Sequence, residues 1–187
     1  MKYSQTDKEK IMDKINKTYD ENIPSTASER TAQDLDIPLS QEAMEEHLKQ
    51  VIYGNNEIQK ESINGMMKCS GGSCSFAEKT LTFNFPIQPW QANRVGNIHG
   101  GIICTAFDLT IAALARFYAR KGFAPTVNLD VNYVRPAHID DTLVVVAKAT
   151  ATGRRITQIV GEAFRKSDGK LVATASSIYM NVDTTKE

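Results

Sequence analysis

An acidic side chain lies within the most apolar segment of the sequence. Asp108 is flanked by Phe107 and Leu109, in a run from Ile102 to Tyr118 that is otherwise nearly all apolar. An ionised carboxylate is costly to bury without a partner, so Asp108 must face a polar group, a water-filled cleft or an interface. In such a place it could act as a general base or a nucleophile. The alternative is a structural role, in which the carboxylate caps a loop or bonds to a facing strand.

A polar loop with three glycines precedes this run. Its sequence is Asn93-Arg-Val-Gly96-Asn-Ile-His99-Gly100-Gly101. Glycines at the start of a helix leave backbone N–H groups open, so a carbonyl oxygen or a phosphate can approach the positive end of the helix. This is the geometry of an oxyanion hole. The alternative is a tight turn in which His99 has a structural role.

The spacing of these two features has a consequence for assembly. Gly100 and Asp108 are eight residues apart, which corresponds to about 12 Å along a helix axis, so one acyl group cannot easily touch both. If Gly100 polarises a carbonyl while Asp108 attacks it or activates water, the two residues must come from different subunits with antiparallel helices. The catalytic interpretation therefore implies a homodimer with two equivalent sites.

The helix that carries these residues is predicted over 99–121, and its apolar surface is typical of a buried core helix. Strands are predicted over 81–87, about 125–135, 142–151, 155–166 and 171–182. In the second of these, apolar side chains alternate at Val127, Leu129, Val131 and Tyr133. Turn sequences at 152–153 and 167–169 predict an antiparallel meander for the last three strands. The expected fold class is α+β, with one long buried helix against a mostly antiparallel sheet of five or six strands.

The first 60 residues differ from the rest in charge. Residues 1–60 carry 8 basic and 12 acidic side chains, whereas residues 61–187 carry 14 and 10. A capping box at Thr6 predicts a short helix, residues 21–37 have the composition of a linker, and Ser40 is the predicted N-cap of a second helix that ends at Gly54. Both helices are too short to be stable alone. We therefore expect 1–60 to be a helical extension and not an independent domain.

Composition excludes several classes of protein. The chain has 187 residues with 22 basic and 22 acidic side chains, which does not suit a uniformly basic nucleic-acid binder. The N-terminus lacks the apolar core of a secretory signal, and no uninterrupted apolar stretch is long enough to span a bilayer. Three cysteines do not make a disulfide framework. These observations favour a cytoplasmic protein without a membrane span.

Taken together, the motifs resemble the hotdog-fold acyl-CoA thioesterases, and more narrowly the phenylacetic-acid-degradation type. The resemblance covers about residues 66–182 and rests on the loop 93–101, on Asp108, on the run from Thr126 to Pro136 and on Gly153-Arg154. It implies a hotdog domain over 61–187, assembled as a dimer or a dimer of dimers. It also implies hydrolysis of an acyl-CoA thioester to a carboxylic acid and free CoA, without a metal or other cofactor.

The resemblance also implies roles for individual residues. Asp108 would be the general base or nucleophile, and the Gly100 N–H would polarise the thioester carbonyl. Asn93 and His99 would help to place the thioester, and Thr126 would orient the attacking water.

The net positive charge of residues 61–187 suits the phosphates of CoA. Arg135, Arg154 and Arg155 are the candidates to bind them, because guanidinium groups bind phosphate oxygens well.

Other cysteines and histidines carry no motif. Cys69 and Cys74 have the wrong spacing for a zinc site and are expected in a turn between two short strands. Cys104 is expected to be a small core residue, and His47 and His138 are expected at the surface.

Two other functions are compatible with the sequence. The first is a hotdog sensor or regulator that binds acyl-CoA and uses its N-terminal helices to bind DNA, which the net negative charge of residues 1–60 disfavours. The second is a hotdog hydratase or dehydratase, which would pair a catalytic histidine with a carboxylate. No histidine lies near Asp108 along its helix.

Overall fold

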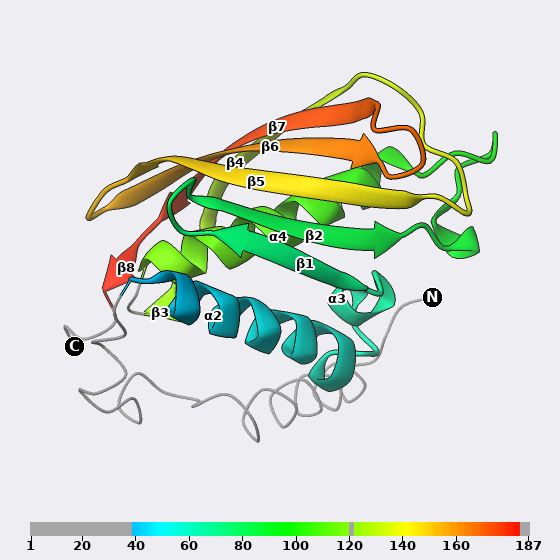
Figure 1. Ribbon diagram of the computed structural model, residues 1–187. Helices are drawn as coiled ribbons and strands as arrows, with labels where there is room; N and C mark the ends of the chain where they lie inside the picture. The colour runs from blue at the N-terminus through cyan, green and yellow to red at the C-terminus, as the bar shows by residue number, and fades with distance from the viewer. Residues whose placement is uncertain (1–38, 120–121, 184–187) are drawn as a thin grey trace, which may run out of the picture. The chain divides into compact units, whose positions relative to one another are not determined.

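A six-stranded antiparallel sheet packs against one long helix (Figure 1). The computed structural model describes residues 39–119 and 122–183. The strands lie side by side in the order β1-β2-β5-β6-β7-β4. Their bounds are β1 Gly71–Ser75, β2 Thr80–Pro86, β4 Thr126–Tyr133, β5 Thr142–Thr152, β6 Ile156–Arg165 and β7 Leu171–Met180. A separate two-stranded sheet pairs β3 Gly122–Phe123 with β8 Val182–Asp183. The predicted α+β layout is confirmed.

The helices lie along one face of the large sheet and beside its β1 edge (Figure 1). They are α2 Gln41–Tyr53, α3 Ile63–Met66 and α4 Gly100–Ala119, with a π-helical turn η2 at Gly54–Ile58 and a 3-10 turn η3 at Pro89–Gln91. The predicted core helix is therefore α4. Within the described part of the chain, α4 alone has the length and apolar composition of a membrane-spanning helix, and 61% of its most apolar window is buried in the fold, as is usual for a core helix.

Helix α2 begins where the sequence predicts. The Ser40 hydroxyl accepts a hydrogen bond from the Ala43 N–H at 3.2 Å, which satisfies one of the free amides of the first turn. Met44 and Leu48 are buried in the same core as α4, so this helix is part of the unit that starts at Ile37. The predicted helix after Thr6 and the linker at 21–37 lie outside the described residues. The boundary predicted at residue 60 stays a prediction.

The predicted meander is confirmed as β5, β6 and β7, which pair antiparallel in sequence order. Alternate residues of each strand are buried against α4, with the period of two that a strand requires. Gly161 of β6 lies directly against Phe107 of the helix. A Cβ atom there would come within 2.9 Å of the Phe107 ring, so only glycine leaves room for this aromatic side chain.

Strand β4 is an edge of the large sheet, because it pairs with β7 alone. Most of its side chains are exposed, among them Val127 at 56% and Tyr133 at 55%. An exposed edge strand of this length offers unpaired backbone groups to another chain.

Three expectations about cysteines and histidines are wrong. Cys74 lies inside strand β1 and Cys69 just before it, so this run forms a strand and the turn follows at residues 76–79. Cys104 is not a core residue but lies partly exposed on α4. His47 is partly buried, and its Nε2–H donates to the carbonyl oxygen of Ala113 at 2.8 Å. His138 is exposed, as predicted.

Candidate active site

The Asp108 carboxylate is held through one of its two oxygens. Its Oδ1 accepts hydrogen bonds from the Tyr179 hydroxyl at 3.0 Å and from the Thr126 hydroxyl at 3.3 Å. Its Oδ2 has no hydrogen-bond partner among the described residues. The side chain is neither fully buried nor fully exposed. The carboxylate is therefore oriented by the protein and keeps one oxygen open for a water molecule or a substrate.

Tyr179 is a residue of this site that the sequence analysis missed. Its side chain is fully buried in β7 beneath α4. Burial raises the pKa of the Tyr179 hydroxyl well above its ordinary value, and the negative charge of Asp108 raises it further. The hydroxyl therefore stays protonated and serves as a permanent donor to Asp108. Alternation along β7 was the available signal, because it places Tyr179 on the inward face with Ala173 and Ala175.

A β-bulge aims Thr126 at the carboxylate. Thr126 pairs with Tyr179 and Asn128 with Ile178, so Val127 is an extra residue in the ladder. Thr126 and Tyr133 are seven residues apart, and in a regular strand such residues would point to opposite faces. The bulge moves Thr126 to the helix side, where Tyr133 also lies, and leaves Val127 exposed.

The loop before α4 is shaped by the side chain of Asn93. Its Oδ1 accepts from the Val95 N–H at 3.0 Å and from the Asn97 N–H at 3.1 Å, and Gly96 takes the φ of +80° that this turn needs. The Asn93 side-chain NH2 group has no partner among the described residues, so it remains a free donor.

His99 caps the N-terminus of α4. Its Nδ1 accepts from the Gly101 N–H at 3.0 Å, so the ring carries its proton on Nε2. The next residue, Gly100, has a backbone N–H with no acceptor in the described part of the chain. Asn93, His99 and Gly100 thus present donors at one end of the helix, where the helix dipole adds positive potential.

The structure brings the predicted residues together in two groups and not in one. Asp108 and Thr126 form the first group, and Asn93, His99 and Gly100 form the second. Gly100 and Asp108 are eight positions apart, so the two groups are separated by about 12 Å along α4. One protomer therefore carries a carboxylate site and a donor site on the same helix, out of reach of a single acyl group.

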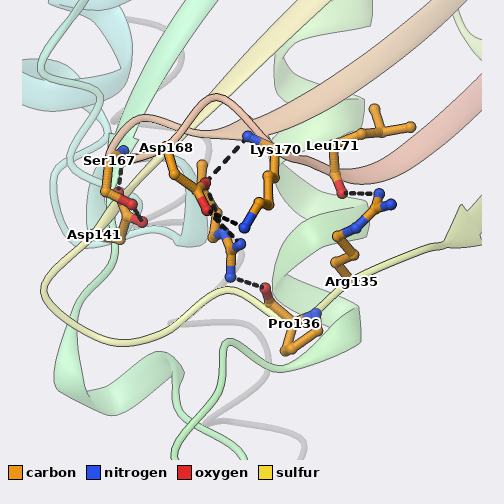
Figure 2. A network of polar contacts seen from close by, with 8 residues as sticks. Arg135, Pro136, Asp141, Ser167, Asp168, Lys170 and Leu171 are labelled. Carbon is orange, nitrogen blue, oxygen red and sulfur yellow. Dashed lines mark hydrogen bonds and ion pairs between the residues drawn. The ribbon is translucent and has the colours of Figure 1, made fainter.

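Arg135 lies near the donor end of the helix. It follows β4, and its guanidinium donates to the carbonyl oxygen of Leu171 at 3.2 Å (Figure 2). Its neighbour Arg165 is held differently, because Asp168 accepts two hydrogen bonds from it, at 2.7 and 3.0 Å. Arg165 also donates to the carbonyl oxygen of Pro136, which ties the segment after β4 to the turn between β6 and β7.

The other two predicted arginines lie at the opposite end of the sheet. Arg154 and Arg155 are exposed in the turn between β5 and β6, and the Arg155 carbonyl accepts from Asn181, just beyond β7. The ten residues of β7 separate this end from Leu171 and Arg135, a length of about 30 Å at the rise of a strand. The three arginines do not form one site within a protomer.

Asp108 hydrogen-bonds to two hydroxyl groups, and the positive charge of Arg116 interacts with it electrostatically. Among residues 39–119 and 122–183, no histidine hydrogen-bonds to it. No cluster of three or more potential metal ligands is found in the same ranges.

Comparison with known proteins identifies the family to which this fold belongs. A family model described as the thioesterase superfamily matches residues 95–172. Acyl-coenzyme A thioesterase 13 of Mus musculus is 30% identical over 101 residues, which are 53% of this chain and 71% of that protein. The Homo sapiens protein of the same name is 29% identical over 89 residues, which are 46% of this chain and 62% of that protein.

Solved structures agree on the fold. Zebra fish thioesterase superfamily member 2 has a TM-score of 0.64 at 18% identity and covers 72% of this chain and 95% of its own. Thioesterase superfamily member 2 from Mus musculus has a TM-score of 0.60 at 19% identity and covers 74% and 98%. The predicted hotdog fold is confirmed. With its oriented carboxylate on the core helix, this chain belongs to the thioesterase superfamily, and the prediction of a thioesterase is confirmed at the level of that family.

Proposed function

We propose that this protein hydrolyses acyl-CoA thioesters to a carboxylic acid and free CoA, as a cytoplasmic homodimer or dimer of dimers of the phenylacetic-acid-degradation type. The observation that carries this proposal is the Asp108 carboxylate, fixed at Oδ1 by Tyr179 and Thr126 and open at Oδ2. The similarity to proteins named acyl-coenzyme A thioesterase 13 supports the choice of substrate class.

The proposed reaction needs only a base and a polarised carbonyl. Asp108 Oδ2 takes a proton from a bound water as the water oxygen attacks the thioester carbon, and the electron pair moves to the carbonyl oxygen. The Gly100 N–H stabilises that oxyanion, with Asn93 and His99 placing the thioester. When the carbon–sulfur bond breaks, the CoA thiolate leaves and takes the proton back from Asp108. As a nucleophile, Asp108 would instead form a mixed anhydride that water hydrolyses.

A two-fold axis would complete this site. Within one helix, Gly100 and Asp108 are about 12 Å apart at the rise of about 1.5 Å per residue. Two antiparallel α4 helices would instead place Gly100 of one protomer beside Asp108 of the other. Strand β4 supports this arrangement, because it is an exposed edge next to the site. It carries the exposed apolar side chain of Val127, and the exposed Val134 follows directly after the strand.

The same axis would unite the predicted CoA-binding arginines. Arg135 lies at the Gly100 end of one protomer, and Arg154 and Arg155 lie at the end of the sheet near Asp108. An antiparallel pair brings the first end of one protomer toward the second end of its partner. Arginines from two protomers could then contact the phosphates of one CoA molecule.

Asp108→Asn tests the proposal. Acyl-CoA substrates with aromatic (phenylacetyl), medium-chain and long-chain groups are supplied, and the release of the CoA thiol is followed with a thiol-reactive dye. We expect kcat to fall by about 10³-fold, because general base catalysis typically contributes 10² to 10⁴. The matched control is Asp140→Asn, an exposed turn residue away from α4, which should keep full activity.

Monitoring the fold and the assembly separates loss of the catalytic carboxylate from misfolding of the variant. Circular dichroism and gel filtration should show that Asp108→Asn folds and assembles like the wild-type protein. A wild-type protein that hydrolyses none of the acyl-CoA substrates, or an Asp108→Asn variant with normal turnover, would overturn the proposed function.

A further inference from the structure

Tyr133 covers the donor end of α4. Although 55% of its surface is exposed, its ring packs against the start of the helix. A Cβ atom added to Gly100 would lie 3.2 Å from the Tyr133 Cζ and 3.3 Å from its hydroxyl oxygen. The hydroxyl donates to the carbonyl oxygen of Gly100 at 3.0 Å. Tyr133 comes from the last position of β4, so an edge strand contacts the first residue of the catalytic helix.

One peptide group is held from both of its ends. The carbonyl oxygen of Gly100 accepts from Tyr133, and the N–H of the same peptide group, which belongs to Gly101, donates to Nδ1 of His99. Hydrogen bonds in series polarise one another, so the tyrosine hydroxyl strengthens the amide as a donor to His99. That acceptor role keeps Nδ1 unprotonated and leaves the ring proton on Nε2.

The geometry points to Tyr133 as a positioning residue of the oxyanion site. By fixing the peptide between Gly100 and Gly101, it orients the free Gly100 N–H on one side and holds His99 as an Nε2–H donor on the other. This inference rests on the proposed function, because it assumes that these two donors receive the thioester oxygen. It assigns no contact with the substrate to Tyr133 itself.

The protonation of Tyr133 suits this role. A hydrogen bond with the Cys104 thiol, at 3.0 Å, together with partial burial, raises the pKa of Tyr133 to about 12. The hydroxyl therefore remains a donor throughout the range in which a cytoplasmic enzyme works. The Cys104 thiol lies on the same helix face, one turn after Gly100, within hydrogen-bond distance of the Tyr133 hydroxyl, and either group can be the donor.

Tyr133→Phe distinguishes the contribution of the hydroxyl from that of the aromatic ring. The variant keeps the aromatic cover over Gly100 and deletes the donor, so kcat for acyl-CoA hydrolysis should fall by about five- to tenfold, the effect of one neutral hydrogen bond, while KM stays unchanged. Tyr53→Phe, at an exposed tyrosine on α2, is the matched control and should have wild-type kinetics. The ¹⁵N spectrum of His99 supplies a second reading, since Tyr133→Phe should replace the single Nε2–H form with a mixture of tautomers.

Three results distinguish failure of the Tyr133 inference from failure of the proposed function. Wild-type kcat and an unchanged His99 tautomer in Tyr133→Phe would overturn the inference, while inactive Asp108→Asn in the same assay would leave the proposed function intact. A normal kcat in Asp108→Asn would overturn the proposed function itself. If Tyr133→Phe changes the elution volume in gel filtration, the assembly of the protein has changed. A His99 ring that keeps only the Nε2–H form in this variant then contradicts the role of Tyr133, whereas a mixture of tautomers supports it.

Discussion

At the scale of single residues, the catalytic candidate is defined by what holds it. Two hydroxyl groups converge on Oδ1 of Asp108, one from a buried tyrosine and one from a threonine at a strand bulge. A carboxylate that accepts two hydrogen bonds on one oxygen is restricted in its rotation. The remaining oxygen then faces a defined direction, which is the condition for positioning a water molecule or attacking a carbonyl.

Tyr179→Phe measures what the buried hydroxyl contributes. We expect kcat to decrease by about tenfold or more with little change in KM, because hydrogen bonds to charged groups contribute about 1.5–3 kcal/mol and the loss leaves Asp108 less constrained. The assay is steady-state hydrolysis of an acyl-CoA. Tyr118→Phe is the matched control, because the Tyr118 hydroxyl is buried and has no partner among the described residues. Equal activity of Tyr179→Phe and the control would contradict the positioning role of Tyr179.

At the scale of elements, α2 and α4 are joined by a polar contact in an apolar setting. The imidazole of His47 donates to the Ala113 carbonyl. Burial lowers the pKa of His47, the nearby positive charge of Arg116 lowers it further, and the hydrogen bond to Ala113 only partly opposes this. The folded protein therefore prefers neutral His47 more strongly than the unfolded chain does.

His47 makes stability depend on pH in a predictable direction. A lowered folded-state pKa means that its contribution is fully present above the unfolded value of about 6.5 and is lost as the pH falls below it. We expect the free energy of unfolding, measured with urea, to fall between pH 7.5 and about pH 5. In His47→Gln, whose amide can still donate to Ala113 but does not titrate, this decrease should be smaller. An identical decrease in both proteins would exclude His47 as its source.

The elements differ in how far the sequence could predict them. Helix α4 and strands β5 to β7 follow directly from apolar periodicity and turn residues, and Ser40 caps α2 as its side chain predicts. Strand β1 escaped prediction because its sequence, Gly-Gly-Ser-Cys-Ser, has no apolar alternation, and pairing with β2 makes it a strand.

The site was predictable only in part. The spacing from Gly100 to Asp108 is local and was visible in the sequence. The contact between Asp108 and Tyr179 joins residues 71 positions apart, and the bulge at Val127 breaks the alternation that would have placed Thr126 on the opposite face. Long-range pairing and an extra residue in a strand leave no periodic signal in the sequence, so these two contacts of Asp108 can be identified only from the structure.

At the scale of the whole molecule, one protomer is half of the proposed site. The donor end of α4 and the carboxylate lie two turns apart on one helix, and the arginines proposed for CoA lie at opposite ends of the sheet. The edge strand β4 runs between the two ends with most of its side chains exposed. Each of these observations is satisfied by an antiparallel pair about a two-fold axis.

Subunit complementation tests this central claim most directly. Gly100→Pro deletes the donor N–H at the first position of the helix, where the backbone suits proline and the proline ring displaces the Tyr133 side chain. Asp108→Asn removes the base. Each homodimer should be inactive. In a heterodimer purified through two different affinity tags, one site combines both defects and the other combines intact Gly100 with intact Asp108, so about half of wild-type activity should return. A heterodimer as inactive as its two parents would contradict a site shared between protomers.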